Sequence, residues 1–166
     1  IEEIKCRLKG KLHALVNNAG ISPKNEKGKR LDSINTDLSI WGQVFHVNFF
    51  ASVILARGMQ KELVKAKGTI VNVTSIAGSR VHPFAGAAYA TSKAALGALT
   101  REMANDFGPL GVRVNAIAPG EVKTAILSKG TEKIVSDIPM KRLGLPEEVA
   151  DTIFYLCSEH ASYVSG

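Results

Sequence analysis

Three short runs of β-branched and other apolar residues limit the fold of this chain more than any other feature of its sequence. They occupy residues 14–16, 69–73 and 112–117, and each ends in a turn that contains glycine or proline. The two long segments between them carry apolar residues at helical spacing. Helices of this length let neighbouring strands run parallel, and nearly continuous apolar strands suit a sheet covered on both faces. The order predicts one doubly wound α/β domain over residues 1–166, with three α/β/α layers and a parallel sheet.

The last third of the chain adds one helix and one irregular segment to this prediction. Pro146 suits the first position of a helix, and Glu147 and Glu148 complement the positive end of its dipole. Residues 124–145 are polar and are interrupted by two glycines and a proline, which predicts a mobile segment with at most a short helix.

Composition excludes several classes of protein. The chain has 166 residues, a formal net charge of +6 and 45% hydrophobic residues, as is typical of one soluble globular domain. No run approaches the roughly 18 consecutive apolar residues of a membrane span, and no signal-peptide pattern is present. Cys6 and Cys157 lie far apart and the four histidines are scattered, so neither a disulfide framework nor a metal site is expected. We therefore expect a cytoplasmic protein without a metal.

The positive charge is concentrated in one polar stretch. Lys24, Lys27, Lys29 and Arg30 form the cluster, which acidic residues interrupt and which contains no aromatic side chain for base stacking. The composition favours an exposed, solvated loop over a nucleic-acid site. Binding to nucleic acid through this loop is a weaker alternative, which an absence of DNA and RNA binding would exclude.

Ser75, Tyr89 and Lys93 form the most informative group of side chains. Tyr89 and Lys93 are four residues apart, so a helix that begins near Ala87 places both on one face. A nearby ammonium favours the phenolate form and brings a tyrosine, whose ordinary pKa is about 10, closer to use as a proton donor or acceptor. Ser75 directly follows the second β run, and open α/β sheets bind ligands at the carboxyl ends of their strands. Its hydroxyl would orient a substrate oxygen.

Other polar and small residues occupy matching positions at the predicted sheet edge. Asn17, Asn18, Ala19 and Gly20 follow the first run directly, and a Pro-Gly pair follows the third. Asn48 interrupts an apolar helical stretch, and a buried amide without partners costs on the order of 1–3 kcal/mol, so backbone or water should satisfy it.

These motifs together resemble the classical short-chain dehydrogenase/reductase family, and within it the branch similar to acyl-carrier-protein ketoreductases. The resemblance covers nearly the whole chain and implies a Rossmann-like fold. The motifs that carry it are LVNNAG at 15–20, VNVTS at 71–75, YATSK at 89–93, RVNAIAPG at 113–120 and PEEVA at 146–150.

The resemblance implies hydride transfer between a nicotinamide cofactor, NAD or NADP, and a ketone or secondary alcohol. Tyr89 would be the general acid for reduction and the base for oxidation. Lys93 would hold the nicotinamide ribose and lower the tyrosine pKa. Ser75 would hydrogen-bond the reacting oxygen, and Asn48 would anchor a water that links Lys93 to solvent.

The resemblance also implies which residues contact the cofactor. On the adenosine side and along the nicotinamide these are Asn18, Ala19, Gly20, Tyr89, Lys93, Pro119, Gly120, Val122 and Thr124. Architectural interpretations stay open: Gly20 could serve the turn alone, Asn17 and Asn18 could tie neighbouring strands, and the Pro-Gly pair could end a strand.

Two departures from the family pattern affect the prediction. The family's glycine-rich turn, which binds the pyrophosphate, does not occur upstream of Asn17, and the chain stops where the family enters its last strand. We therefore expect a domain that is incomplete at both ends, and the choice between NAD and NADP is open. The missing turn also motivates an alternative function, a catalytically silent cofactor sensor or scaffold of the same fold.

The predicted substrate walls and association surface are less specific. His82, Pro83, Phe84 and residues 124–145 are the expected substrate walls. Glu121 replaces the family's usual apolar residue after the Pro-Gly pair, so no single residue fixes a substrate. The small residues of the second long helix permit close packing, and family members pair their two long helices across an interface. A homodimer or homotetramer is therefore expected.

Overall fold

In the described part of the chain, three parallel strands form one sheet. The computed structural model describes residues 1–127 and 130–166. The strands β1 (Ala14–Asn17), β2 (Thr69–Val73) and β3 (Arg113–Ile117) are hydrogen-bonded in the order β1-β2-β3. They coincide with the three runs predicted from the sequence, although β1 continues to Asn17 and β3 begins one residue after Val112.

The long helices lie where the apolar spacing predicted them. The first is built from three consecutive segments: α2 (Leu38–Phe45), a π-helical segment (His46–Phe50) and α3 (Ala51–Gly58). The second is α5 (Ala87–Phe107), and α6 (Pro146–Cys157) begins at the predicted proline. The short helices α1 (Glu2–Arg7) and α4 (Gln60–Ala66) were not predicted. Short 3₁₀ helices occupy Ile76–Gly78, Gly108–Leu110, Thr131–Asp137 and Glu159–Ala161.

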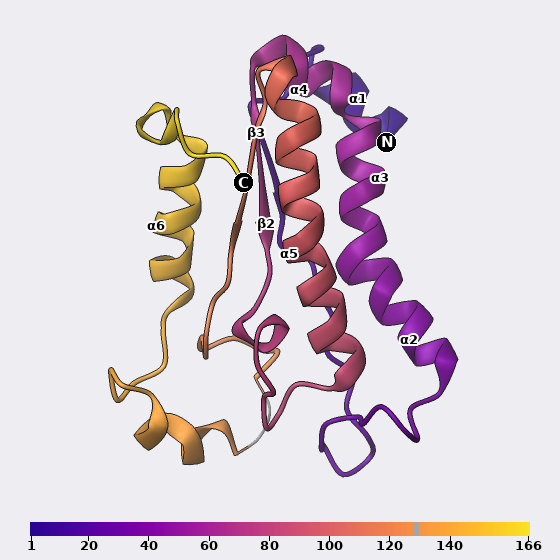
Figure 1. Cartoon of the computed structure of the whole chain (residues 1–166), viewed down its shortest axis with the longest axis vertical. Helices are drawn as coiled ribbons and strands as arrows, with labels where there is room; N and C mark the ends of the chain where they lie inside the picture. Colours follow the sequence, from indigo (N-terminus) through magenta and orange to yellow (C-terminus); the bar gives the residue numbers. More distant parts are fainter. Residues whose placement is uncertain (128–129) are drawn as a thin grey trace.

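The sheet is covered on both faces, which confirms the three-layer, Rossmann-like prediction. Figure 1 shows α3 and α5 on one side of the strands and α6 on the other. Successive residues of β2 point to opposite faces. Ile70 packs with Leu63 and Met103 in one core, whereas Val71 packs with Leu156 of α6 in another, and both strand residues are fully buried. Burial on both sides explains why β2 is apolar almost without interruption.

Two side chains of β3 hold the C-terminal part of the chain in place. The Arg113 guanidinium donates to the carbonyls of Leu156 (2.8 Å) and Ser158 (3.2 Å) at the end of α6. Nδ2 of Asn115 donates to the Val164 carbonyl (2.8 Å). The Arg113 and Asn115 side chains of the RVNAIAPG motif are therefore architectural.

The segment between β3 and α6 is closed at its base by backbone pairing. Val122 and Gly144 form a parallel bridge. The Lys123 N–H donates to the Gly144 carbonyl (2.9 Å), and the Gly144 N–H donates to the Glu121 carbonyl (2.8 Å). A 3₁₀ helix at Thr131–Asp137 agrees with the expected short helix. The prediction for 124–145 also falls on Ser128 and Lys129, which lie outside the described residues.

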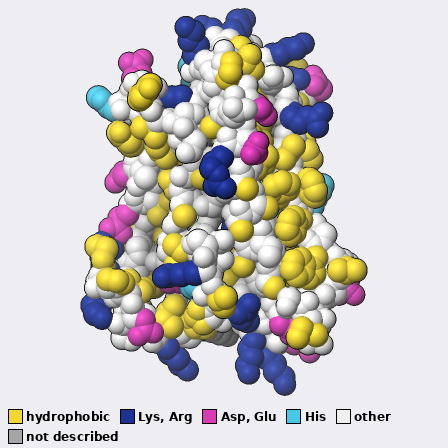
Figure 2. All heavy atoms as spheres, in the orientation of Figure 1, with side chains coloured by type: hydrophobic (Ala, Val, Ile, Leu, Met, Phe, Trp, Pro, Cys, Tyr) yellow, Lys and Arg dark blue, Asp and Glu magenta, His cyan; other side chains and the backbone are white. Residues whose placement is uncertain are grey.

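One helical stretch corrects the expectation that no segment is apolar enough to cross a membrane. Leu38–Gly58 spans 21 residues and has the length and composition of a membrane-spanning helix, and 17% of its most apolar window is buried. The stretch is apolar on average, but Asn48 and Ser52 interrupt it, so it contains no membrane-length run of consecutive apolar residues. In Figure 2, hydrophobic side chains gather on the side of the molecule where Figure 1 draws α2 and α3.

Candidate active site

The carboxyl ends of β2 and β3 and the start of α5 surround one cavity. Ser75 follows β2 with an extended backbone and caps the 3₁₀ helix Ile76–Gly78, because its Oγ accepts a hydrogen bond from the Ala77 N–H (3.2 Å). The cap does not use the Ser75 hydroxyl hydrogen, which can be donated to the Tyr89 hydroxyl or to a ligand.

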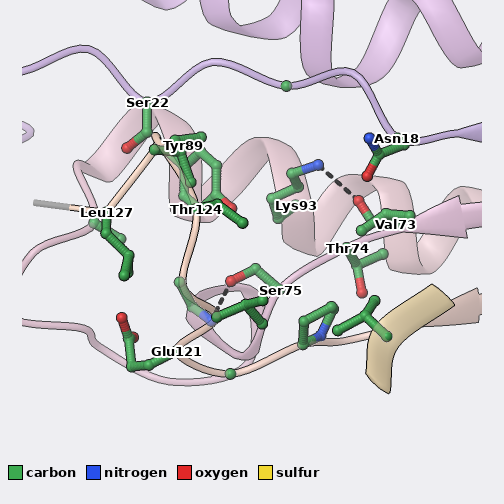
Figure 3. A pocket seen from close by; sticks show the side chains of 18 of the residues that line it. Asn18, Ser22, Val73, Thr74, Ser75, Tyr89, Lys93, Glu121, Thr124 and Leu127 are labelled. Atoms are coloured by element: carbon green, nitrogen blue, oxygen red, sulfur yellow. Dashed lines mark hydrogen bonds between the residues drawn. The ribbon is translucent and has the colours of Figure 1, made fainter. Parts of the chain in front are cut away.

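Tyr89 and Lys93 lie on one face of α5, which begins at Ala87 as predicted. Nζ of Lys93 donates to the Val73 carbonyl at the end of β2 (2.7 Å) and lies 5.9 Å from the centroid of the Tyr89 ring. In Figure 3, Ser75, Tyr89 and Lys93 surround one hollow. The sheet edge and the helix face thus bring together the three groups that the sequence singled out.

The cavity has a volume of about 530 Å³ and contains most of the predicted site residues. Those that line it are Asn18, Gly20, Ser75, Tyr89, Lys93, Pro119, Gly120, Val122 and Thr124. Ala19 and Asn48 do not line it. Asn48 is buried behind the wall, close to Gly20.

Burial dominates the proton affinities of the two titratable groups. It lowers the pKa of Lys93 from 10.5 to about 8. It raises the pKa of Tyr89 above 10.0, the Ser75 hydroxyl offsets part of this rise, and the Glu121 carboxylate adds to it. The structure therefore differs from the expectation that Lys93 lowers the tyrosine pKa. The reason is geometric, because the ammonium is directed at Val73 rather than at the phenol oxygen.

Asn48 is held entirely by protein groups. Its Oδ1 accepts from the Ile21 N–H (2.8 Å), and its Nδ2 donates to the Ile21 carbonyl (3.0 Å) and to Oγ of Ser92 (3.1 Å). The π-helical segment around it is a rare geometry that often occurs at functional sites. The expected satisfaction by backbone is confirmed, and the water-anchoring role stays a prediction.

Gly20 is required for space rather than for a turn. Its φ is not in the left-handed region, but a β-carbon there would lie 3.3 Å from Nζ of Lys93 and 3.5 Å from Oδ1 of Asn48. Gly78 was not among the predicted site residues, and it likewise provides space, here between the Ser75 turn and α5. A β-carbon at Gly78 would lie 2.8 Å from the backbone nitrogen of Ala94, so glycine alone lets the Ser75 turn rest on α5.

Asn17 has the architectural role that the sequence left open. Its Nδ2 donates to Oδ1 of Asn72 in the neighbouring strand (2.8 Å), and Nδ2 of Asn72 donates to Oγ1 of Thr100 in α5 (2.9 Å). The hydroxyl of Thr100 donates to the Leu96 carbonyl (2.8 Å). This chain of hydrogen bonds ties β1, β2 and α5 together, whereas Asn18 lines the cavity.

Three charged or titratable side chains complete the wall in a way that the motifs did not indicate. Oε1 of Glu121 lies 2.6 Å from Nε2 of His82, and both side chains are nearly buried. Lys24, expected in a solvated loop, lines the cavity instead, and its Nζ donates to the Phe84 carbonyl and to Oγ of Ser22 (3.2 Å). The sequence marks His82 as part of the expected substrate wall and Glu121 as a departure from the family pattern, but neither signal indicates that the two side chains pair.

Comparisons with known proteins agree with the motifs. A family model described as enoyl-(acyl carrier protein) reductase matches residues 1–166. Protein FixR of Bradyrhizobium diazoefficiens is 60% identical over 168 residues, which cover 100% of this chain and 60% of that protein. The 3-oxoacyl-[acyl-carrier-protein] reductase FabG of Aquifex aeolicus is 36% identical over 174 residues, with 99% of this chain and 65% of that protein covered. This chain therefore spans less than two thirds of the length of these relatives.

A solved structure shares the same fold. The crystal structure of a short-chain dehydrogenase/reductase family oxidoreductase from Brucella ovis, in complex with a partially ordered NAD, is 61% identical with a TM-score of 0.85. The match covers 99% of this chain and 68% of that one. Geometry, motifs and relatives agree that the chain belongs to the short-chain dehydrogenase/reductase family.

Proposed function

We propose that the protein to which this chain belongs is a nicotinamide-dependent oxidoreductase that acts on a carbonyl group or a secondary alcohol. The observation that carries the proposal is the shared cavity of Ser75, Tyr89 and Lys93, in which a proton donor, a hydrogen-bond donor and a cation face one space. The NAD in the Brucella ovis relative supports the choice of cofactor class, and NAD and NADP stay equal alternatives.

The residues around Lys93 fit a nicotinamide nucleotide. Within the described part of the chain, the Lys93 ammonium makes one hydrogen bond, to the Val73 carbonyl, which leaves two hydrogens for a vicinal diol such as that of a ribose. Gly20 leaves the space beside this ammonium open. Asn18 and Thr124 line the same cavity and supply further polar contacts, in line with their proposed roles.

The proposed chemistry divides between the cofactor and the chain. A reduced nicotinamide, when bound, supplies a hydride to the carbonyl carbon. The Ser75 hydroxyl donates a hydrogen bond to the carbonyl oxygen and fixes its position. The Tyr89 hydroxyl gives its proton to that oxygen as the alcohol forms, and in oxidation the phenolate takes it back. Lys93 would hold the nicotinamide ribose, and Asn48 would hold the proton path behind it.

Replacing the proton donor tests the proposal. In the complete gene product, Tyr89→Phe should lower kcat for ketone reduction by roughly 10²-fold or more while the cofactor dissociation constant stays unchanged. Tyr155→Phe is the matched control, because Tyr155 lies on α6 with 47% of its surface exposed, and it should leave turnover unchanged. Undiminished turnover in Tyr89→Phe would remove the assigned acid. Tight cofactor binding without turnover of any ketone in the wild type would favour the sensor or scaffold function.

We further propose that the protein associates as a homodimer or homotetramer in the cytoplasm. The apolar and largely unburied stretch Leu38–Gly58 supports a second copy as the partner, because α2, α3 and α5 lie together on one side of the sheet. The free thiols of Cys6 and Cys157 are compatible with a reducing compartment.

A further inference from the structure

Glu121, whose carboxylate is hydrogen-bonded to His82, forms part of the wall that the substrate would meet. Glu121 follows the Pro-Gly turn after β3, and its side chain is 12% exposed. It lines the main cavity and also a second, neighbouring cavity of about 700 Å³, and His82 lines both as well. Figure 3 draws Glu121 and Asn18 at opposite ends of the main cavity. The carboxylate therefore lies away from the proposed contact Asn18, next to Gly120 and Val122 on the proposed nicotinamide side.

His82 fixes this carboxylate and does not neutralise it. Nδ1 of His82 accepts hydrogen bonds from the backbone N–H groups of Phe84 (3.2 Å) and Ala85 (3.3 Å). An acceptor at Nδ1 carries no hydrogen, so the ring hydrogen is on Nε2 and is donated to Oε1 of Glu121 (2.6 Å). A protonated imidazole would lose both backbone bonds. Within the described residues Oε2 of Glu121 has no hydrogen-bond partner, so the carboxylate retains an acceptor for a ligand.

Lys24 limits which ligand can use that acceptor. Its ammonium lines the same cavity, is fixed by Phe84 and Ser22, and lies close enough to Glu121 for their charges to interact. A cationic ligand group would be repelled by Lys24 and an anionic one by Glu121. A neutral hydroxyl can donate to the carboxylate and accept from the ammonium without adding charge. A purely aliphatic group would offer no donor to Oε2 of Glu121 and no acceptor to the remaining hydrogen of the Lys24 ammonium.

We propose that Glu121, positioned by His82, selects substrates that carry a further hydroxyl group beyond the reacting carbon, such as hydroxyketones and polyols. This inference rests on the proposed function, since it assigns the substrate class of the same cavity. It makes Glu121 the specificity-determining residue of the pocket and His82 its positioning residue.

Isosteric ketones in matched variants test the inference. Hydroxyketones are compared with their methyl isosteres at three lengths: 1-hydroxypropan-2-one with butan-2-one, 4-hydroxybutan-2-one with pentan-2-one, and 5-hydroxypentan-2-one with hexan-2-one. For at least one pair, the ratio of kcat/KM values should be roughly tenfold or more higher in the wild type than in Glu121→Leu. Glu121→Gln keeps the shape of the side chain and a neutral acceptor, so its ratio should lie between those of the wild type and Glu121→Leu. This variant also controls for misfolding of Glu121→Leu. Because each pair is compared across variants, the intrinsic reactivity of the ketones cancels.

A control variant and a binding measurement distinguish failure of the hydroxyl site from failure of the proposed oxidoreductase function. Glu147→Leu changes an exposed glutamate on α6 outside both cavities and should keep the wild-type ratio. Ligand-observed NMR with oxidised cofactor present measures affinity for the same pairs without reduction. No turnover of any ketone would contradict the proposed function, while a binding preference lost in Glu121→Leu would still support the hydroxyl site. Equal ratios in wild type and Glu121→Leu, or a more than tenfold preference for 1-aminopropan-2-one over 1-hydroxypropan-2-one, would overturn the inference.

Discussion

At the residue scale, the space beside the Lys93 ammonium depends on the absence of a side chain at Gly20. An added methyl would lie 3.3 Å from Nζ, and Lys93 cannot easily retreat because it is buried and bonded to Val73. Gly20→Ala should therefore lower the free energy of unfolding by about 1 kcal/mol and reduce kcat roughly tenfold. Gly97→Ala is the control, because no atom lies within 4 Å of the added carbon in α5, and alanine there should stabilise by up to about 1 kcal/mol. Equal effects of the two substitutions on kcat would contradict this explanation.

The buried Lys93 also predicts how stability depends on pH. The folded-state pKa is about 8, against 10.5 for the ordinary group, so between these values the unfolded chain binds a proton that the folded protein does not. The contribution of Lys93 to the free energy of unfolding therefore increases as pH rises through this range. Urea denaturation from pH 7.5 to 9.5 should show the wild type gaining about 2 kcal/mol relative to Lys93→Met. A difference that does not change with pH would contradict the assigned pKa.

Residues with a local signal were predictable from the sequence, and residues defined by contacts between distant loops were not. Ser75, Tyr89 and Lys93 lie at strand ends or at helical spacing, and the fold brings them into one cavity as predicted. The pairing of His82 with Glu121 joins loops 39 residues apart, because the ends of β2 and β3 are adjacent in the sheet. No local sequence pattern indicates that these two side chains pair.

At the scale of elements, α5 is tied to the sheet through Thr100. Its hydroxyl accepts from the buried amide of Asn72, which in turn accepts from Asn17. Thr100→Val keeps the shape but leaves that amide hydrogen unsatisfied, so the free energy of unfolding should fall by about 1–3 kcal/mol. Thr91→Val makes the same change on the exposed side of α5, where the hydroxyl bonds only to backbone carbonyls of its own helix, and should cost under about 0.5 kcal/mol. Chemical denaturation of both variants checks the difference.

The helix that contains Asn48 shows what periodicity can and cannot predict. Apolar residues at Val44, Val47 and Ala51 fit a regular helix, and a helix is present. Apolar residues three or four positions apart share one face in a regular α-helix, and they still share it when one turn widens to a π-helix. The spacing therefore does not reveal the π-helical turn. That turn contains Asn48, whose side chain bonds to the backbone of Ile21, and this tertiary contact is also not encoded in the spacing.

At the scale of the whole molecule, the apolar surface over α2 and α3 predicts self-association. Ile54 is 47% exposed on α3, in the stretch that has the composition of a membrane helix. Ile54→Asp should shift the wild-type dimer or tetramer to a monomer in light scattering, since a buried unpaired charge costs several kcal/mol. Val81→Asp, at a residue outside α2 and α3 with 86% exposure, should leave the molar mass unchanged. A monomeric wild type, or an Ile54→Asp variant of unchanged mass, would contradict the proposed interface.

The backbone bridge between Val122 and Gly144 has a consequence for how such a molecule can diversify. The two ends of the intervening stretch are fastened to each other, and each end continues into a fixed part, Glu121 on one side and α6 on the other. Insertions or deletions between Val122 and Gly144 change the shape of the pocket rim without displacing the strands or the proposed reacting groups. Natural variation in this rim can therefore change the proposed substrate specificity while Ser75, Tyr89 and Lys93 keep their relative positions.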